Sequence, residues 1–247
     1  MRWSCAARSA RRTSSDVATR EDILEELGLT PVWRLKARVE HRDEAAQAPV
    51  QPIVMDRAGR IAALAWDAFA ADVAACTECG LCRTRQRAVP GVGDTRAEWM
   101  FIGEAPGAEE DARGEPFVGQ AGRLLDNMLA AIGLSRRKGV YIANVLKCRP
   151  PNNRTPEPLE VEACRPYLTR QIELIEPRII VALGKSAAST LLNVDASIAS
   201  LRGRVHRLAG KPLVVTYHPA YLLRNLPDKA KAWEDLLFAR RVLKEAV

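Results

Sequence analysis

The chain has 247 residues, of which 47% are hydrophobic, so it is long enough to bury the core of one large domain. It contains no apolar run of about 18 residues or more, which argues against a membrane-spanning helix. Its formal charge of +7 suits a polyanionic partner, but charge alone selects no function because many ordinary proteins are as basic.

Residues 1–55 are predicted to form a partly disordered appendage that precedes the working domain. The first 20 residues hold five arginines and one aspartate, a composition that favours a disordered tail over a transit peptide. Thr19 and Asp22 are placed to cap a short helix. The sequence AAQAPVQP at 45–52 is typical of a linker, so the folded domain is expected to begin after it.

The working domain, predicted at residues 56–247, alternates short apolar runs with helical stretches. A helix predicted from Ile61 to Val73 leads into a run of cysteines. The alternation after it predicts a parallel sheet with helices on both faces. The predicted strands are Trp99–Gly103, Val140–Val145, Ile179–Leu183 and Leu213–Tyr217, and the predicted helices after them are Ala121–Ile132, Glu157–Ile175, Ser186–Leu192 and Lys229–Ala246.

Polar residues stand where these strands end, and open parallel sheets bind ligands at that edge. Glu104 follows the first strand, Asn144 lies in the second near its end, Gly184 follows the third and His218 follows the fourth. Three of these side chains could recognise or activate a ligand, and the glycine could hold a phosphate at a helix start. The alternatives are a helix-start carboxylate for Glu104, a turn residue for Asn144 and a structural role for His218.

Two nucleotide-binding motifs are rejected. The sequence GKS at 184–186 resembles the end of a Walker A loop, but the first glycine of that loop would fall at Ile179, inside a strand. The sequence GVG at 91–93 lacks a third glycine and precedes its strand. Nucleotide hydrolysis and dinucleotide-dependent redox chemistry therefore lose support.

Two further segments have both a structural and a functional interpretation. Phe117 lies in the glycine-flanked loop GEPFVGQAG and is either a core anchor or a platform on which a nucleobase stacks. The sequence LLR at 222–224 is either core plus a surface charge, or an apolar wedge with a phosphate contact.

Six cysteines without a secretory signal favour metal or redox chemistry over disulfides. Cys76, Cys79 and Cys82 form a tight run, and Cys148 and Cys164 lie far downstream. A C-x2-C pair can hold one metal centre, and a distant second pair can complete its coordination. Spacing alone does not distinguish a zinc site from an iron–sulfur cluster, and it does not show which pair within the run would bind the metal. It is also compatible with thiols that are simply buried as small apolar side chains.

Taken together, these motifs resemble the family 4 uracil-DNA glycosylases, the iron–sulfur branch of that superfamily. The resemblance covers about residues 70–245, and the motifs occur in the family's order. They are CTEC at 76–79, FIGEAPGAEED at 101–111, GEPFVGQAGRLLD at 114–126, YIANVLKCRPPNNRTP at 141–156, Cys164, and HPAYLLR at 218–224.

The resemblance implies a three-layer α/β/α fold with a central four-stranded parallel sheet. It also implies a hydrolase that cuts the N-glycosidic bond of uracil in DNA and leaves an abasic site, the first step of base-excision repair. A structural 4Fe-4S cluster would be held by Cys76, Cys79, Cys148 and Cys164, which leaves Cys82 outside the family's pattern.

The same resemblance assigns roles in base recognition. Phe117 would stack on uracil, the side-chain amide of Asn144 would pair with its Watson–Crick edge, and His218 would donate to O2. An amide can accept from uracil N3–H while it donates to O4, which cytosine cannot match. Backbone N–H groups around Glu104 and Ala105 would line the same pocket, together with Gly103.

The remaining roles are less directly transferable. Related family 1 enzymes have an aspartate where this chain has Ala105, so their general base has no counterpart at this position. Glu104 is the candidate for positioning the water or steadying the cationic sugar. Leu222 or Leu223 would fill the gap left by the flipped nucleotide, and Arg224 would contact phosphate.

These expectations describe a monomeric enzyme that acts on single- or double-stranded DNA in the cytoplasm, at the nucleoid, without a membrane. One rival function is a related glycosylase for another deaminated or mispaired base. The other is a cluster-bearing nucleic-acid-binding module without catalysis, which would bind DNA with steep salt dependence.

Overall fold

The structure, a computed structural model, describes residues 18–31 and 56–245. The chain divides into two units, Met1–Ile53 and Val54–Val247, and the described residues of each are treated separately. In the first unit the predicted short helix is present as α1 (Arg20–Glu26), and the side chain before it forms the expected capping box. The predicted linker and the arginine-rich tail lie outside the described residues.

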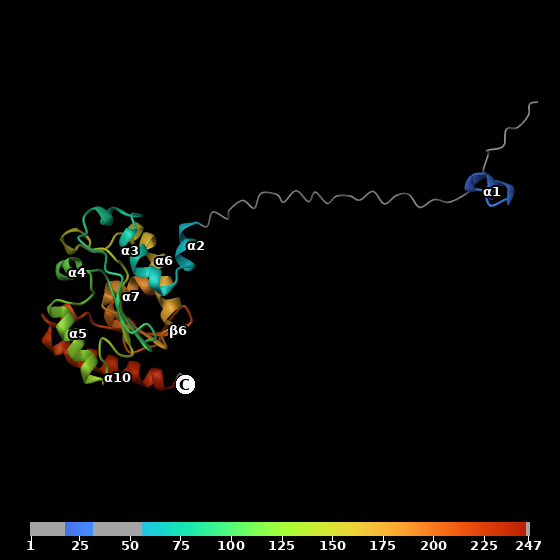
Figure 1. Ribbon diagram of the computed structural model, residues 1–247. Helices are drawn as coiled ribbons and strands as arrows, with labels where there is room; N and C mark the ends of the chain where they lie inside the picture. Colours follow the sequence, from blue (N-terminus) through green and yellow to red (C-terminus); the bar gives the residue numbers. More distant parts are fainter. Residues whose placement is uncertain (1–17, 32–55, 246–247) are drawn as a thin grey trace, which may run out of the picture. The chain divides into compact units, whose positions relative to one another are not determined.

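The second unit is built on a six-stranded sheet with the order β1-β3-β2-β4-β6-β5 (Figure 1). Its four central strands are parallel, as predicted. Two antiparallel strands border them, β1 (Val92–Gly93) and β5 (His206–Leu208), which are too short to produce a periodic signal in the sequence. The central strands are β2 (Trp99–Gly103), β3 (Val140–Asn144), β4 (Ile179–Leu183) and β6 (Lys211–Thr216).

Helices cover both faces of the sheet, which gives the predicted three-layer α/β/α arrangement (Figure 1). They are α5 (Gln120–Ala131), α6 (Pro158–Ile175), α7 (Lys185–Leu192) and α10 (Lys229–Glu245), with bounds close to those predicted. Trp99 and Phe101 of β2 pack in the core under α5 and α10. Met100 and Ile102, which point the other way, pack in the core under α6 and α7.

The single helix predicted across residues 61–73 is wrong. The chain forms α2 (Arg57–Ala62) and α3 (Trp66–Ala75), separated by a short break. The guanidinium of Arg170 on α6 donates two hydrogen bonds, at 2.8 and 2.7 Å, to the carbonyl of Leu64 inside that break. The break therefore has a fixed partner, and the apolar residues of both helices still pack in one cluster with α6.

The other elements are short. They are η1 (Gly80–Arg83), α4 (Ala108–Arg113), η2 (Pro151–Asn153), α8 (Ile198–Leu201), α9 (Pro219–Leu222) and η3 (Leu226–Asp228). Within residues 18–31 and 56–245, no helix combines the length and the apolar character needed to cross a bilayer.

The carboxyl ends of the central strands meet at one edge of the sheet. Gly103 of β2 lies in register with Asn144 of β3, and Leu183 of β4 lies in register with Thr216 of β6. The N–H of Gly184 donates to the carbonyl of Thr216 at 2.8 Å, which joins the next two loops. The loops that carry the candidate site residues are therefore neighbours, although they are far apart in the sequence.

Candidate active site and metal centre

Residues from separate loops converge at the carboxyl edge of the sheet. A side-chain carbon added to Gly103 would lie 2.4 Å from Oδ1 of Asn144 and 2.7 Å from Cζ of Phe117, so both side chains approach this backbone. The ring centroids of Phe117 and His218 are 5.5 Å apart. We call Gly103, Glu104, Phe117, Asn144 and His218 the strand-end cluster.

Asn144 is 2% exposed, and its Oδ1 has no hydrogen-bond partner. A buried acceptor without a partner costs about 1–3 kcal/mol. The structure therefore does not contain the alternative in which this oxygen accepts a hydrogen bond from the turn after β3. An N–H donor on a bound ligand would satisfy the oxygen at the point where Phe117 and Gly103 also meet it.

Phe117 combines the two roles that the sequence left open. Its side chain is 5% exposed and belongs to the core cluster under α5 and α10, as a core anchor would. Its ring also borders His218 and the Oδ1 side of Asn144. The packing on the core side holds the ring in place beside the other members of the strand-end cluster.

His218 is the N-cap of α9, and its Nδ1 accepts a hydrogen bond from the N–H of Ala220 at 3.1 Å. Burial lowers the pKa of His218 to about 4; the charge of Arg224 acts in the same direction and that of Glu110 opposes it. The imidazole is therefore neutral near pH 7. Because Nδ1 accepts, Nε2 carries the proton and is a hydrogen-bond donor.

This tautomer gives a first prediction. In ¹⁵N NMR spectra, the ring of His218 is expected to stay neutral, with its proton on Nε2, from pH 8 down to about pH 5. A lowered pKa means that the ring becomes half protonated only near pH 4. His218→Gln assigns the signal by removing it. Protonation of His218 at the ordinary histidine value near 6.5 would contradict the burial argument.

Glu104 is partly buried beside the start of α7. Burial raises the pKa of its carboxyl group, and a hydrogen bond with the side chain of Ser186 opposes that rise. The carbonyl of Glu104 accepts from the N–H of Leu146 at 3.0 Å, which holds its loop against the loop after β3. The GKS segment thus contributes Ser186 to the site rather than a phosphate loop.

The segment after His218 differs from the sequence prediction. Leu222 is 1% exposed and packs with Tyr217 and Ala232, so it is unavailable as a wedge. Leu223 is 38% exposed. Arg224 is exposed as well, and the described part of the chain contains no hydrogen bond or ion pair of its guanidinium. Of the two leucines, only Leu223 stands where it can meet a partner.

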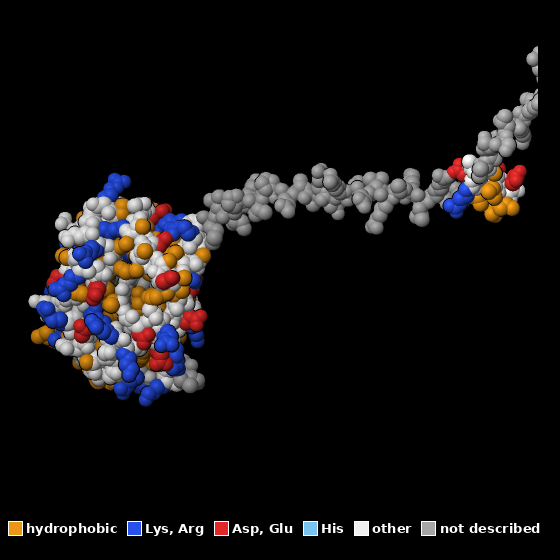
Figure 2. Space-filling model, viewed as in Figure 1, with side chains coloured by type: hydrophobic (Ala, Val, Ile, Leu, Met, Phe, Trp, Pro, Cys, Tyr) orange, Lys and Arg blue, Asp and Glu red, His pale blue; other side chains and the backbone are white. Residues whose placement is uncertain are grey.

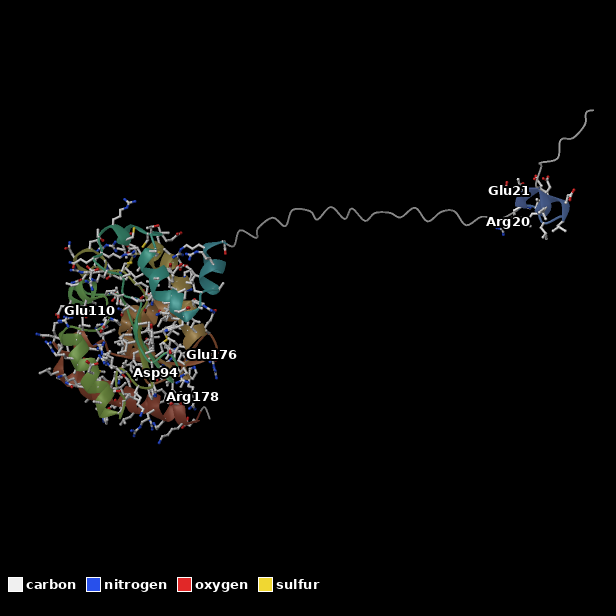
Figure 3. The ribbon with its side chains drawn as sticks, viewed as in Figure 1. Arg20, Glu21, Asp94, Glu110, Glu176 and Arg178 are labelled. Carbon is white, nitrogen blue, oxygen red and sulfur yellow. The ribbon has the colours of Figure 1, made fainter. Side chains whose placement is uncertain are left out.

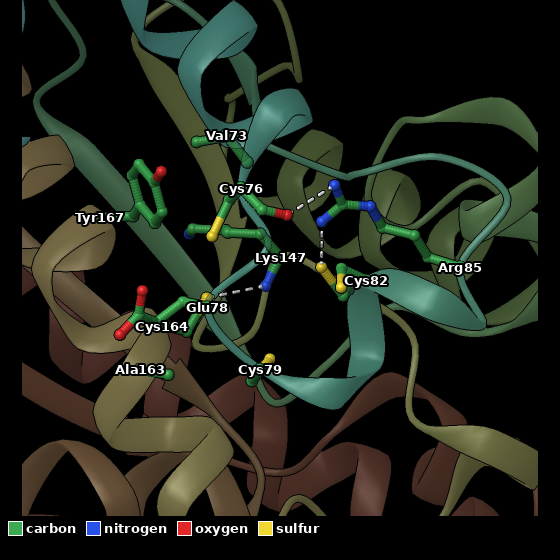
Figure 4. Close-up of a pocket in the computed structure, with 11 residues that line it drawn as sticks. Val73, Cys76, Glu78, Cys79, Cys82, Arg85, Lys147, Ala163, Cys164 and Tyr167 are labelled. Carbon is green, nitrogen blue, oxygen red and sulfur yellow. Dashed lines mark hydrogen bonds between the residues drawn. The ribbon is translucent and has the colours of Figure 1, made fainter.

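Five cysteines line one pocket, which we call the cysteine pocket (Figure 4). They come from the end of α3, the η1 turn, the loop after β3 and the helix α6. Among residues 18–31 and 56–245, no three histidine, cysteine or acidic side chains are placed as ligands of a metal ion. The cysteines are Cys76, Cys79, Cys82, Cys148 and Cys164.

Nitrogen donors surround these sulfurs. The backbone N–H of Lys147 donates to Sγ of Cys164 at 3.3 Å (Figure 4). Nη1 of Arg85 donates to Sγ of Cys148 at 2.9 Å. Nη2 of Arg57 lies 3.5 Å from Sγ of Cys76. Hydrogen bonds and positive charges of this kind stabilise thiolates, which is the form of cysteine that binds metals.

Burial acts on the thiols in the opposite sense. It raises the pKa of Cys79 and of Cys148, and it raises the pKa of Cys164 to about 11, although Lys147 opposes the last shift. Thiols with raised pKa values keep their protons near pH 7, so a metal must displace those protons when it binds.

The sequence reasoning missed Lys147. This lysine is 1% exposed, and its Nζ donates to the carbonyl of Asn144 at 2.7 Å and to Oε1 of Gln171. Burial lowers its pKa to about 8, which the thiols of Cys148 and Cys164 oppose. The only signal in the sequence was a cation within NVLKC, between a strand and a cysteine, which does not distinguish a buried lysine from an exposed one.

Comparison with known proteins identifies the family. The profile described as "Uracil DNA glycosylase superfamily" matches residues 90–237. A type-4 uracil-DNA glycosylase of Archaeoglobus fulgidus is 50% identical over 165 residues, which cover 64% of this chain and 82% of that protein. A type-4 enzyme of Saccharolobus solfataricus is 48% identical over 190 residues, which cover 73% and 86%.

A type-5 uracil-DNA glycosylase of Pyrobaculum aerophilum is similar at a lower level, 36% identical over 155 residues that cover 56% of this chain and 68% of that protein. The chain belongs to the uracil DNA glycosylase superfamily. The resemblance to its family 4 branch, drawn from the motifs, is confirmed.

Proposed function

We propose that the protein is a uracil-DNA glycosylase, which hydrolyses the N-glycosidic bond of uracil in DNA and leaves an abasic site for base-excision repair. The observation that carries this proposal is the convergence of Phe117, Asn144 and His218 beside the backbone of Gly103. It occurs in a chain about half identical to type-4 uracil-DNA glycosylases.

Base recognition follows from the unpaired oxygen of Asn144. That oxygen accepts from uracil N3–H, while the amide nitrogen donates to uracil O4. Cytosine presents an amino group at position 4 and no hydrogen at N3, so it leaves the same buried groups unpaired. A site whose buried groups pair with uracil therefore rejects cytosine strongly. The ring of Phe117 supports the flipped base by stacking.

Bond cleavage sends the bonding electrons from the sugar into the base, and negative charge builds on uracil O2. The neutral imidazole of His218 donates its Nε2–H to that oxygen. Glu104 positions the water that adds to the sugar carbon or steadies the positive charge on the sugar. Glu104 follows Gly103 directly in the chain, and its carboxyl forms a hydrogen bond with the side chain of Ser186.

The thiols of Cys76, Cys79, Cys148 and Cys164 are proposed as ligands of a 4Fe-4S cluster. Support comes from their position around one pocket and from the nitrogen donors at three of the sulfurs. When bound, the cluster supplies a covalent cross-link that ties the end of α3 to α6 and to the loop after β3.

The partner is DNA, and we propose that the enzyme binds it as a monomer at the nucleoid in the cytoplasm. Figure 2 shows lysine and arginine side chains over much of the visible face of the folded unit, with acidic side chains among them. Such cations contact phosphates without regard to sequence. Arg224 is proposed for a phosphate contact, and Leu223 for the gap left by the flipped base.

The function is tested with uracil-containing single- and double-stranded oligonucleotides, treated with alkali after incubation. We expect strand cleavage at the uracil position and none in matched oligonucleotides that carry cytosine or thymine there. Oligonucleotides with hypoxanthine or a thymine mismatch test the rival glycosylase. Intact uracil strands after incubation with iron-loaded protein would contradict the proposal and favour the non-enzymatic DNA-binding module.

A further inference from the structure

The loop that carries Phe117 holds an unusual backbone conformation. Phe117 has a φ of +54°, in the left-handed region that a bulky side chain rarely adopts. Such a conformation costs free energy and persists only where surrounding contacts enforce it. The contacts around this loop therefore identify the residues that hold Phe117 in this conformation.

Glu110, which is labelled in Figure 3, lies in the first turn of α4 and accepts hydrogen bonds from the loop. Its Oε1 accepts from the N–H of Val118 at 3.0 Å and from the N–H of Gly119 at 3.3 Å. Its Oε2 accepts from the N–H of Gly107 at 3.1 Å, at the start of the same helix. One carboxylate thus joins the first turn of α4 to the two residues after Phe117.

Arg136, beyond the end of α5, binds the loop from the other side. Its Nη1 donates to the carbonyl of Pro116 at 2.8 Å, and its Nη2 donates to the carbonyl of Phe117 at 2.6 Å. Its Nε donates to Asp126 on α5 at 2.9 Å, which fixes the guanidinium plane. Two side chains of opposite charge therefore bind one backbone group from each of four consecutive residues, from the carbonyl of Pro116 to the N–H of Gly119.

The first turn of α5 leaves room for this arrangement. A side-chain carbon added to Gly122 would lie 1.7 Å from the carbonyl oxygen of Phe117. Glycine at this position therefore lets the loop carbonyl pack directly on the helix. The same carbonyl is the one that Arg136 binds, so the steric and hydrogen-bond constraints act on one peptide group.

We propose that Glu110 and Arg136 are positioning residues for base recognition, which lock Phe117 in its left-handed conformation so that its ring is in place before uracil enters. This inference rests on the proposed function, in which Phe117 stacks on the base. Neither charged residue is assigned a contact with the substrate. Their effect is preorganisation, because a loop that is already ordered loses less freedom when the ligand binds.

The test is a double-mutant cycle on the full-length, iron-loaded protein, with the variants Phe117→Ala, Arg136→Ala and the two combined. We expect Arg136→Ala alone to lower kcat/KM for uracil release, and the affinity for free uracil, by about tenfold. In the Phe117→Ala background the same change is expected to alter both by less than about twofold, because a residue that acts only through Phe117 has nothing left to position. Arg137→Ala, at the exposed neighbouring position, is the matched control.

Further variants keep the test decisive. Arg136→Lys retains a cation and is expected to recover part of the loss, and it replaces Arg136→Ala in the cycle if the alanine variant does not fold. Glu110→Gln is expected to show part of the same dependence on Phe117; because the charge of Glu110 also acts on His218, a smaller loss is expected to remain in the Phe117→Ala background. Equal losses in both backgrounds would mean that Arg136 is merely structural and would overturn the proposal.

Failure of the inference is distinguishable from failure of the proposed function. If the unmodified protein releases no uracil, the proposed function fails. If Phe117→Ala lowers uracil release but Arg136→Ala does not, the function stands and the inference alone is overturned.

Discussion

Replacing His218 by alanine is expected to lower the rate of uracil release by about a hundredfold to a thousandfold. The variant loses the Nε2–H donor that meets the charge building on O2, and this charge is absent when the substrate is merely bound. A hundredfold loss corresponds to about 2.7 kcal/mol of transition-state stabilisation. Single-turnover rates on a uracil oligonucleotide measure it, and titration with the same DNA measures affinity, which is expected to change less than about twofold.

His206→Ala is the control for this experiment. His206 lies on the edge strand β5, where its Nε2 is 2.8 Å from the carbonyl of Leu201, outside the strand-end cluster. The control is expected to keep nearly the full rate. An equal loss of catalysis and DNA affinity in His218→Ala would instead show that His218 supports the structure of α9 and makes no contact with the reacting base.

Replacing Cys79 by serine is expected to remove most of the bound iron and sulfide and to lower the melting temperature, whereas Cys82→Ser is expected to keep both. The two cysteines stand three residues apart on either side of the start of η1, and both line the cysteine pocket. A structural metal centre contributes its binding free energy to folding, so loss of one ligand destabilises the fold. Iron and acid-labile sulfide per chain, the visible spectrum and thermal unfolding measure the difference.

The opposite pattern, with iron lost in Cys82→Ser and kept in Cys79→Ser, would show that Cys82 is a ligand and would revise the set. Zinc in place of iron and sulfide, in protein purified without added metal, would overturn the cluster itself. The pair of serine variants therefore shows which of Cys79 and Cys82 is a ligand, and the metal and sulfide analysis identifies the kind of metal centre.

The central sheet could be predicted because buried parallel strands are short apolar runs, and two of them end at a glycine. The bounds Trp99–Gly103 and Ile179–Leu183 are confirmed residue for residue. The break between α2 and α3 could not be predicted, since its partner, Arg170, lies about a hundred residues away in the sequence. Tertiary contact there overrides a continuous helical pattern.

The position of the site followed from a general rule, because the carboxyl ends of parallel strands share an edge. The convergence of Asn144 and His218 was expected on that ground, and that of Phe117 from the family resemblance; their chemical roles stay predictions. The burial of Leu222 was not predictable, since two adjacent leucines give no sign of which one faces the core. The positive φ of Phe117 could not be predicted either, because it depends on contacts of the loop with Glu110 and Arg136.

Lys147 occupies the short stretch between the buried amide of Asn144 and the thiol of Cys148. Its side chain is anchored under Asn144, while its own N–H touches Cys164, so one residue is shared by the two centres. The contacts of Lys147 therefore fix this stretch on both sides. An insertion between Asn144 and Cys148 is expected to displace the strand-end cluster or the cysteine pocket, and a designer who wished to transplant the loop after β3 would have to carry the cysteine pocket with it.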